Sequence, residues 1–163
     1  MVFQNPQDSF DPRQRLEAGI IESLQNYGMS KKDARKRTGE LLAMAELEPE
    51  YAKRYPHQVS GGQCQRAAIA RALAVNPKLL ICDEATSALD VTVQSQIVEL
   101  LKKLQKETQM SYLLICHDLA LVQTMCDRVL VMHQGKIIEE GTPNEVIRNP
   151  REEYTKELVD SVL

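Results

Sequence analysis

The chain has 163 residues, of which 43% are hydrophobic and 26% are charged, and its formal net charge at pH 7 is −3. This length and apolar content predict one globular domain with an ordinary core and exclude a disordered tail. The acidic balance argues against wholesale nucleic-acid binding, because that function needs a clustered positive surface. No apolar run approaches the ~20 residues that span a bilayer, and the N-terminus shows no signal-peptide pattern, so any membrane role is expected to depend on a partner.

The N-terminal part of the chain is predicted to be mainly helical. "MVF" resembles the end of a strand and is followed by "QNPQDSFDPR", a stretch rich in turn formers. From Arg13 to about Leu47 apolar residues recur at helical spacing. Within this stretch Ser30 is a predicted N-cap, and Asp33 closes a capping-box-like pair.

The pattern changes after Tyr55-Pro56. "KLLICDE" (78–84) predicts a buried strand, "VTVQSQIVELLKKLQKETQ" (91–109) an amphipathic helix, and "SYLLICHD" (111–118) a second buried strand. A strand, a helix and a strand joined by short loops predict a βαβ unit and therefore a parallel sheet.

The C-terminal part is predicted to hold a hairpin and helices. "RVLVMHQGKIIEEG" (128–141) reads as two strands that turn at Gln134-Gly135. Thr142 then offers an N-cap, with Pro143 at the first helical position and Glu145 closing a capping box.

The four cysteines show no C-x-x-C spacing. We therefore expect reduced thiols in a cytosolic protein rather than a metal site or a disulfide framework. Two of them, Cys82 and Cys116, end apolar runs that are typical of buried strands.

A glycine-rich motif opens a predicted helix between Gln58 and Leu73, "QVSGGQCQRAAIARAL". Backbone N–H groups at a glycine-rich helix start suit an anion. A P-loop requires G-x-x-x-x-G-K-[ST], whereas Gly62 is followed here by glutamine and cysteine. The motif therefore predicts an anion site without a lysine of its own. Arg66 and Arg71, on the same helix, are interpreted as a solvated or salt-bridged face.

Two carboxylates, Asp83 and Glu84, end the first buried strand in "LLICDEATSALD". Open α/β sheets bind their ligands at this end of their strands. Phosphoryl transfer from ATP needs a Mg²⁺ ligand, often a strand-end Asp, and a group that activates the attacking water. Acidic pairs also end strands merely to meet solvent, but the eight specified residues of "DEATSALD" would rarely arise together by chance.

These motifs together resemble those of the ATPase subunits of ATP-binding-cassette (ABC) transporters. "VSGGQCQR" is similar to the signature loop, "LLICDE" to the Walker B strand, "SALD" to the D-loop, "LLICHD" to the switch-histidine strand and "VFQNP" to the Q-loop. The order and spacing match over nearly the whole chain. "FQNPQDSFDPR" and "EEGTPNEVIRNPREEYTKELV" further resemble the subclass that serves oligopeptide, dipeptide and nickel importers.

The resemblance implies a nucleotide site shared between two subunits. Ser60, Gly61 and Gly62, with Gln63 in the same loop, would contact the γ-phosphate of an ATP bound to the opposite subunit of a head-to-tail dimer. Asp90 of the D-loop would reach across that dimer and join the nucleotide-binding residues.

The resemblance also implies the catalytic residues and the cofactors, ATP and Mg²⁺. Glu84 would be the catalytic glutamate, and His117 the switch histidine that contacts the γ-phosphate and orients the water. Asp83 would be a Mg²⁺ ligand. Gln4 would belong to the Mg²⁺ and water shell and report the nucleotide state to the helical segment.

The implied fold is α/β, a partial P-loop NTPase-like core whose parallel sheet is flanked by helices, with an inserted α-helical subdomain. All of 1–163 would form a partial ABC ATPase domain. Its expected segments are the Q-loop region (1–12), the helical subdomain (13–57), the core with signature, Walker B, D-loop and switch histidine (58–141), and the C-terminal helices (142–163).

No P-loop motif occurs in these 163 residues, and the only Gly-Lys pair, Gly135-Lys136, is followed by isoleucine. The chain therefore resembles a C-terminal portion of such a subunit and is expected to be inactive alone. One hypothesis is an importer ATPase for peptides or nickel. The alternative is a non-catalytic interaction module that donates its signature loop to a complete partner. A chromosome-maintenance or DNA-repair ATPase would normally carry long coiled coils or zinc-binding cysteines, and neither is seen.

The expected partners are a second ABC ATPase subunit, in a homodimer or a heterodimer, and transmembrane permease subunits, without nucleic acid. The expected location is cytoplasmic, peripheral on the inner face of the cell membrane.

Overall fold

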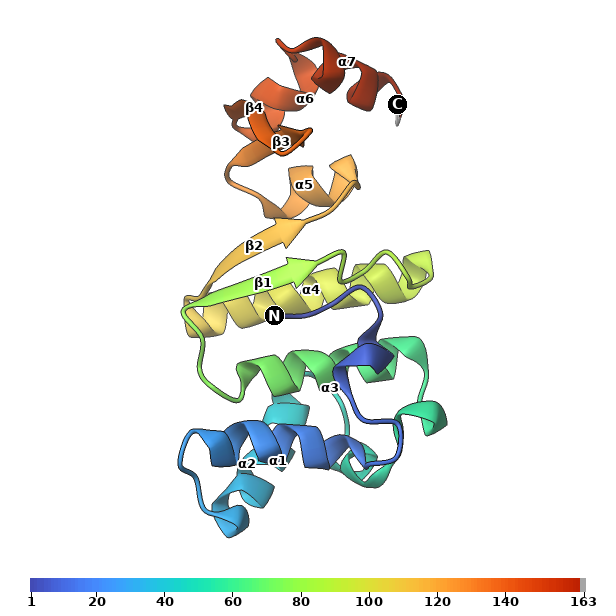
Figure 1. The fold of residues 1–163 in the computed structure, drawn as a ribbon, viewed down its shortest axis with the longest axis vertical. Coiled ribbons are helices and arrows are strands. Elements are labelled where there is room, and N and C mark those ends of the chain that lie inside the picture. The colour runs from blue at the N-terminus through green and yellow to red at the C-terminus, as the bar shows by residue number, and fades with distance from the viewer. Residues whose placement is uncertain (162–163) are drawn as a thin grey trace. The chain divides into compact units, whose positions relative to one another are not determined.

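The computed structural model describes residues 1–161 and divides the chain into two compact units, Met1–Ile115 and Cys116–Leu163 (Figure 1). The last two residues of the predicted C-terminal segment 142–163 lie outside the described residues. None of the helices in the described part is long and apolar enough to cross a bilayer.

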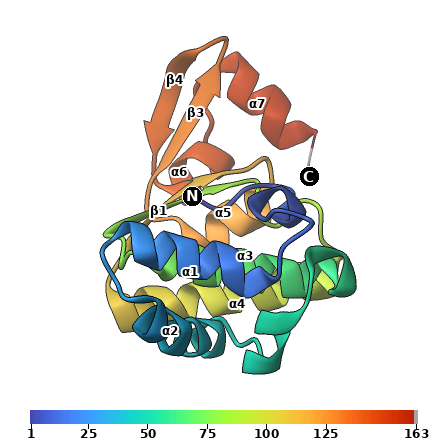
Figure 2. The same cartoon turned by 60° about the horizontal axis from the view of Figure 1, so that its bottom comes forward.

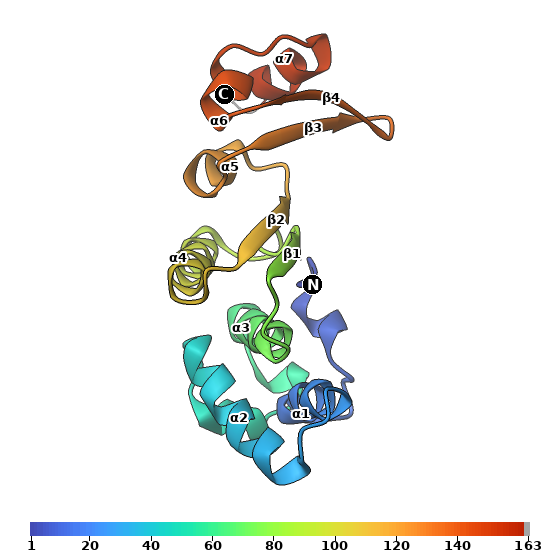
Figure 3. The same ribbon diagram turned by 90° about the vertical axis from the view of Figure 1, so that its left-hand side faces the viewer.

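The first unit is built mainly from helices. In chain order its elements are η1 (Pro6–Ser9), α1 (Leu16–Asn26), α2 (Lys31–Met44), η2 (Pro49–Lys53), η3 (Pro56–Gln58), α3 (Gly61–Leu73), β1 (Leu79–Asp83), α4 (Val91–Thr108) and β2 (Ser111–Ile115). Figures 2 and 3 show α1 and α2 beside α3. The buried leucines and isoleucines of these helices, such as Leu16, Ile20, Leu41 and Ile69, form the core of this helical part.

Three of the longer helices in this unit start at a residue whose side-chain oxygen caps the first turn. Ser30 Oγ accepts a hydrogen bond from the backbone N–H of Asp33 (3.2 Å) at the start of α2, as predicted. Ser60 Oγ and Asp90 Oδ1 accept equivalent bonds at the starts of α3 (3.3 Å) and α4 (3.0 Å). These bonds satisfy N–H groups that a helix cannot satisfy internally.

The strands β1 and β2 pair in parallel, in register from Leu79 opposite Ser111 to Asp83 opposite Ile115. Because α4 connects them, the predicted βαβ unit is confirmed. The predicted strand end at "MVF" is also confirmed, since Val2 forms a parallel bridge to Cys82. The N–H of Val2 donates to the Ile81 carbonyl (2.8 Å).

The two faces of this sheet are covered unequally. Val2, Leu80 and Cys82 share one face and are 3% exposed or less. Figures 1 and 3 show α4 alongside the strands, and the hydroxyl of Tyr112 in β2 donates to the Leu101 carbonyl of α4 (2.8 Å). The other face presents apolar side chains that are between 45% and 52% exposed: Met1, Phe3, Leu79, Leu113 and Ile115.

The prediction of buried strands is therefore wrong for the exposed face of this sheet. β2 ends at Ile115, and Cys116, which follows it, is only half-buried. An apolar run indicates a strand, but it does not report whether both faces of that strand are covered. Cys82 is buried as predicted, and all four cysteines are free thiols.

The second unit consists of α5 (Leu119–Met125), β3 (Val129–His133), β4 (Lys136–Gly141), α6 (Pro143–Arg148) and α7 (Glu153–Asp160). The predicted hairpin is confirmed, because β3 and β4 are antiparallel. Gln134 and Gly135 both have positive φ angles (47° and 77°), the conformation of a tight two-residue hairpin turn. The capping box between Thr142 and Glu145 starts α6 as predicted.

Candidate functional site

Three of the predicted site residues lie at one edge of the small sheet. Val2 is paired with Cys82, so Gln4 and Glu84 each lie two residues beyond a paired position, and Asp83 lies between Cys82 and Glu84. Parallel strands end at the same edge of a sheet, and that edge is where open α/β sheets bind ligands. The structure therefore brings together the residues proposed for Mg²⁺ and for water activation.

The backbone at Glu84 is held in an unusual conformation. Its φ angle is +46°, in the left-handed region that residues other than glycine rarely adopt. Its N–H donates to the carbonyl of Ile115 at the end of β2 (2.8 Å). The hydroxyl of Ser87 donates to the Glu84 carbonyl (3.0 Å) and lies 3.4 Å from the carboxylate. Strained backbone of this kind persists where its surroundings fix it, and it clusters at functional sites.

The start of α3 presents N–H groups that the helix does not use. Ser60 and Gln63 satisfy each other, because the Ser60 N–H donates to Gln63 Oε1 (3.0 Å) and the Gln63 N–H donates to Ser60 Oγ (3.3 Å). Gly61 and Gly62 follow Ser60 as the first two helical residues, so their N–H groups have no partner within the helix. At the positive end of the helix dipole, these two N–H groups suit an anion.

The two glycines have different surroundings. A Cβ atom at Gly62 would lie 2.5 Å from Cγ1 of Val93 in α4, which is far inside van der Waals contact. A Cβ atom at Gly61 would meet only Leu89 Cδ2, at 3.4 Å. Gly62 is buried and Gly61 is exposed. Gly62 is therefore needed for the packing of α3 against the first turn of α4, whereas Gly61 has room for a methyl group in ordinary contact with Leu89.

The side chain of Gln63 forms hydrogen bonds within the first unit. Its Oε1 completes the capping box with Ser60, and its Nε2 donates to the hydroxyl of Tyr51 (2.9 Å). Its contribution in this structure is to shape the start of α3.

Asp90 also has a local role, since its carboxylate caps α4. It is exposed at the end of the "SALD" segment, so the cap leaves the residue accessible to a partner.

His117 belongs to the second unit and is described with that unit. It is exposed and directly precedes Asp118, whose carboxylate caps α5 by accepting from the N–H groups of Ala120 (2.9 Å) and Leu121 (3.1 Å). Gln4, Asp83 and Glu84 belong to the first unit, and His117 belongs to the second.

The two arginines of α3 form specific contacts. Arg66 pairs with the Glu46 carboxylate (3.0 Å) and also donates to the Ala45 carbonyl, so the predicted salt-bridged face is confirmed for this residue. Arg71 instead donates to the carbonyl of Ser9, and its guanidinium lies 5.9 Å from the centre of the Phe10 ring. Arg71 thereby connects the segment after Gln4 to α3, a contact that the sequence did not reveal.

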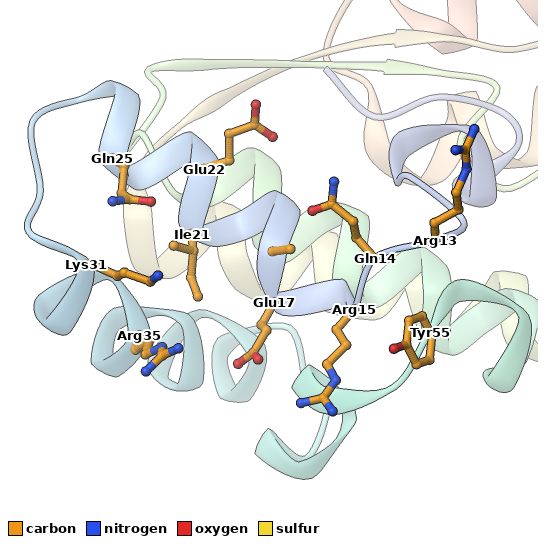
Figure 4. Close-up of a pocket in the computed structure, with 11 residues that line it drawn as sticks. Arg13, Gln14, Arg15, Glu17, Ile21, Glu22, Gln25, Lys31, Arg35 and Tyr55 are labelled. Atoms are coloured by element: carbon orange, nitrogen blue, oxygen red, sulfur yellow. The ribbon is translucent and has the colours of Figure 1, made fainter.

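A pocket of about 570 Å³ lies in the helical part of the same unit (Figure 4). It is lined by Arg13, Gln14, Arg15, Glu17, Ala18, Ile21, Glu22, Gln25, Lys31, Arg35 and Tyr55. Figure 4 shows Glu17 between Arg15 and Arg35 in that view. Cationic side chains outnumber the acidic ones in this lining, and none of the predicted site residues belongs to it.

The residues at the sheet edge suit a hard cation. The carboxylate of Asp83 and the amide oxygen of Gln4 are oxygen ligands of the kind that Mg²⁺ prefers. Within residues 1–161, no three His, Cys, Asp or Glu side chains are grouped so that they could hold a metal ion. Mg²⁺ would therefore need phosphate oxygens of a nucleotide and water as further ligands, which is its usual coordination at phosphoryl-transfer sites.

Several known proteins are similar to this chain over most of its length. The oligopeptide transport ATP-binding protein OppF of Salmonella typhimurium is 48% identical over 164 residues, which cover 99% of this chain and 49% of OppF. The glutathione import ATP-binding protein GsiA of Escherichia coli is 49% identical over 162 residues, which cover 99% of this chain and 26% of GsiA. The chain thus spans about half the length, or less, of these relatives.

Solved ABC cassettes share the fold. The cassette cbiO1 of Clostridium perfringens, part of the transporter complex cbiONQ, matches with a TM-score of 0.79 and 32% identity, over 99% of this chain and 61% of cbiO1. The dimeric cassette MJ0796, in a state bound to ADP and Pi, matches with a TM-score of 0.73 and 35% identity, over 86% of this chain and 62% of that cassette. These matches confirm the predicted α/β class and P-loop NTPase-like fold.

The sequence model of the ABC transporter family matches residues 1–87 of this chain. This range includes Gln4, the α3 motif and the Asp83-Glu84 pair. This chain belongs to the ABC transporter family.

Proposed function

We propose that the chain is part of the ATP-hydrolysing subunit of an ABC importer, and that peptides are its transported substrate. The observation that carries the proposal is the strand register that places Gln4, Asp83 and Glu84 at one sheet edge. The substrate class is supported by the relatives, one named for oligopeptide transport and another for glutathione import. Nickel, the other substrate class that the sequence suggested, is named by neither of these two relatives.

The chemistry assigns separate tasks to these residues. Asp83 and Gln4 would hold Mg²⁺, which neutralises charge on the nucleotide phosphates when it is bound. Glu84 would accept a proton from the water that attacks the γ-phosphorus. Its fixed backbone would keep the carboxylate in one direction, and positioning of this kind is a large part of phosphoryl-transfer catalysis.

The N–H groups of Gly61 and Gly62 would hold the γ-phosphate of a nucleotide bound mainly by another subunit. They supply hydrogen-bond donors and the positive end of the α3 dipole. No lysine is needed in this loop, because a P-loop elsewhere in the site would cradle the other phosphates. No P-loop motif occurs in the 163 residues. The proposed activity is therefore that of the whole subunit, with this segment supplying the signature, Walker B and D-loop residues.

The proposed partners follow from a nucleotide site that is shared between subunits. A second ATPase subunit would face the start of α3, and transmembrane permease subunits would place the complex at the inner face of the membrane. The pocket at Arg13, Arg15, Lys31 and Arg35 is suited by charge to an acidic segment of such a permease subunit. His117 would contact the γ-phosphate, and Asp90 would approach the second subunit.

Replacing Glu84 in the whole subunit tests the proposed function. Glu84→Gln keeps the size of the side chain but removes the charge that attracts the proton of water. MgATP hydrolysis should fall by roughly 10²–10⁴, the usual range for loss of a positioned base, while nucleotide binding persists. If the wild-type whole subunit binds a complete cassette but hydrolyses no MgATP, the alternative of a non-catalytic interaction module replaces this proposal.

A further inference from the structure

Gln65 is a fully buried polar residue of α3 that none of the proposed catalytic steps uses. It is 0% exposed, and its Nε2 donates to the carbonyl oxygen of Ala85 at 2.6 Å. Within the described residues its Oε1 has no hydrogen-bond partner. A Gln amide can form up to four hydrogen bonds, and a buried amide that forms only one destabilises the fold relative to an apolar side chain of the same shape.

The acceptor of this bond lies beside the proposed general base. Ala85 follows Glu84 and is itself buried. The N–H of Glu84 is held by β2, through the Ile115 carbonyl, and the carbonyl of Ala85 is held by α3, through Gln65. The Glu84-Ala85 dipeptide, with its left-handed φ angle at Glu84, is thus fixed from two different elements. Removing one of these bonds would let the backbone relax toward a more common conformation.

Gln65 lies in the same helix as the proposed anion site. Gly61 and Gly62 form the first turn of α3, and Gln65 follows in the next turn. A helix moves nearly as a rigid element, so a displacement at its first turn also displaces the Gln65 amide. Gly62 additionally packs on Val93 of α4, which ties the same first turn to the end of the "SALD" segment.

We propose that Gln65 is a positioning residue that couples the N-terminal end of α3 to the Glu84 turn. Binding of a nucleotide phosphate at Gly61 and Gly62 then fixes the position of α3. Through its hydrogen bond to the Ala85 carbonyl, the Gln65 amide in turn fixes the position of the Glu84 carboxylate. The proposal rests on the proposed function, and it assigns Gln65 no contact with the substrate.

The test replaces Gln65 by methionine in the whole subunit. Gln65→Met keeps the length of the side chain and removes both the donor and the unpartnered oxygen. The matched control is Ile69→Val, a small change at another fully buried position of α3, one turn further along. Melting temperature reports on stability, steady-state kinetics report on catalysis, and amide hydrogen exchange reports on order in residues 84–89.

Gln65→Met should lower kcat for MgATP by about 10-fold or more while KM changes little, because positioning rather than ground-state binding is lost. Amide exchange in residues 84–89 should accelerate, and exchange in α3 should stay at the level of the Ile69→Val control. A purely structural role would instead make both variants lose melting temperature and kcat in parallel. Wild-type kcat or unchanged exchange in Gln65→Met overturns the proposal.

The two proposals fail in distinguishable ways. A wild-type subunit without ATPase activity contradicts the proposed function, and the exchange comparison still decides whether Gln65 orders the Glu84 turn. If Gln65→Met does not fold, Gln65→Leu provides the same comparison with a slightly smaller apolar side chain. Accelerated amide exchange in residues 84–89 then supports the positioning role of Gln65, and unchanged exchange overturns it.

Discussion

The two glycines at the start of α3 look equivalent in the sequence but have different structural roles. Gly62 has no space for a methyl group, because its Cβ position lies 2.5 Å from Val93 Cγ1. Gly61 has that space. An experiment that probes the anion site should therefore alter Gly61, since a change at Gly62 would disturb packing before it disturbed binding.

This difference predicts opposite effects on stability. Gly62→Ala should destabilise the first unit by about 1–3 kcal/mol, the usual range for overpacking. Gly61→Ala should be neutral or slightly stabilising, since alanine favours helix more than glycine does by up to about 1 kcal/mol. Thermal or urea unfolding of the two variants checks this, and equal stabilities would contradict the packing role of Gly62.

Much of the candidate site at the residue scale could be predicted from the sequence because its motifs are local. The helix start at Ser60, Gly61 and Gly62 and the strand end at Asp83-Glu84 follow from neighbouring residues. The bond between Gln65 and Ala85 could not be predicted, because it joins residues that are 20 positions apart and depends on how α3 packs. Gln65 falls inside the signature-like motif, but the motif gives no indication that its amide faces the Glu84 turn.

At the scale of elements, one buried carboxylate connects the hairpin of the second unit to its last helix. Glu139 of β4 accepts hydrogen bonds from the N–H groups of Arg151 (3.0 Å) and Glu152 (3.2 Å), just before α7. Burial by itself would raise the pKa of Glu139, but these backbone hydrogen bonds contribute to a net pKa below the ordinary value. The ionised carboxylate therefore holds the start of α7 against the hairpin.

This interaction makes the stability of the second unit depend on pH. Because the pKa of Glu139 is lower in the folded protein than in the unfolded chain, the stabilisation is present above the unfolded value and is lost as pH falls through the folded value. Glu139→Gln should lower stability at neutral pH and reduce the loss on acidification. Amide exchange in α7 at several pH values measures this, and a variant with wild-type pH dependence would exclude the role of Glu139.

The order and type of the elements followed from sequence periodicity. Which faces of the strands are covered by neighbouring elements did not. β1, α4 and β2 were predicted within a few residues, because the strands are short apolar runs and the helix has an amphipathic pattern. Periodicity alone does not give the exposure of Leu113 and Ile115, because apolar composition does not tell which neighbouring element covers a strand. The same limit applies to Cys116, which follows β2 and is half-buried.

At the scale of the whole molecule, the exposed apolar sheet face should affect how the 163-residue chain behaves in solution. Phe3, Leu79, Leu113 and Ile115 are each about half exposed on one face, and within residues 1–161 β2 pairs with β1 alone. Apolar patches and unpaired edges of this kind promote association. We therefore expect the isolated chain to self-associate as its concentration rises.

Sedimentation velocity over a wide concentration range measures this association. Leu113→Lys should weaken it by placing a charge on the exposed face. Val91→Lys is the matched control, since Val91 is 83% exposed but lies at the start of α4, outside the sheet. A chain that remains monomeric at all concentrations, or two variants with equal effects, would show that the sheet face does not drive association.

The proposed function requires that the start of α3 bind the phosphate of a nucleotide held by another subunit. The most direct measurement is the mass of the whole subunit in MgATP, by size-exclusion chromatography with light scattering. Glu84→Gln should form a stable dimer, because ATP is bound but not cleaved and its γ-phosphate continues to bridge the two chains. Adding Gly61→Asp should abolish this dimer without abolishing ATP binding, because a carboxylate at the helix start repels the phosphate. A Glu84→Gln subunit that stays monomeric with bound ATP, or a double variant that dimerises equally well, would contradict this requirement.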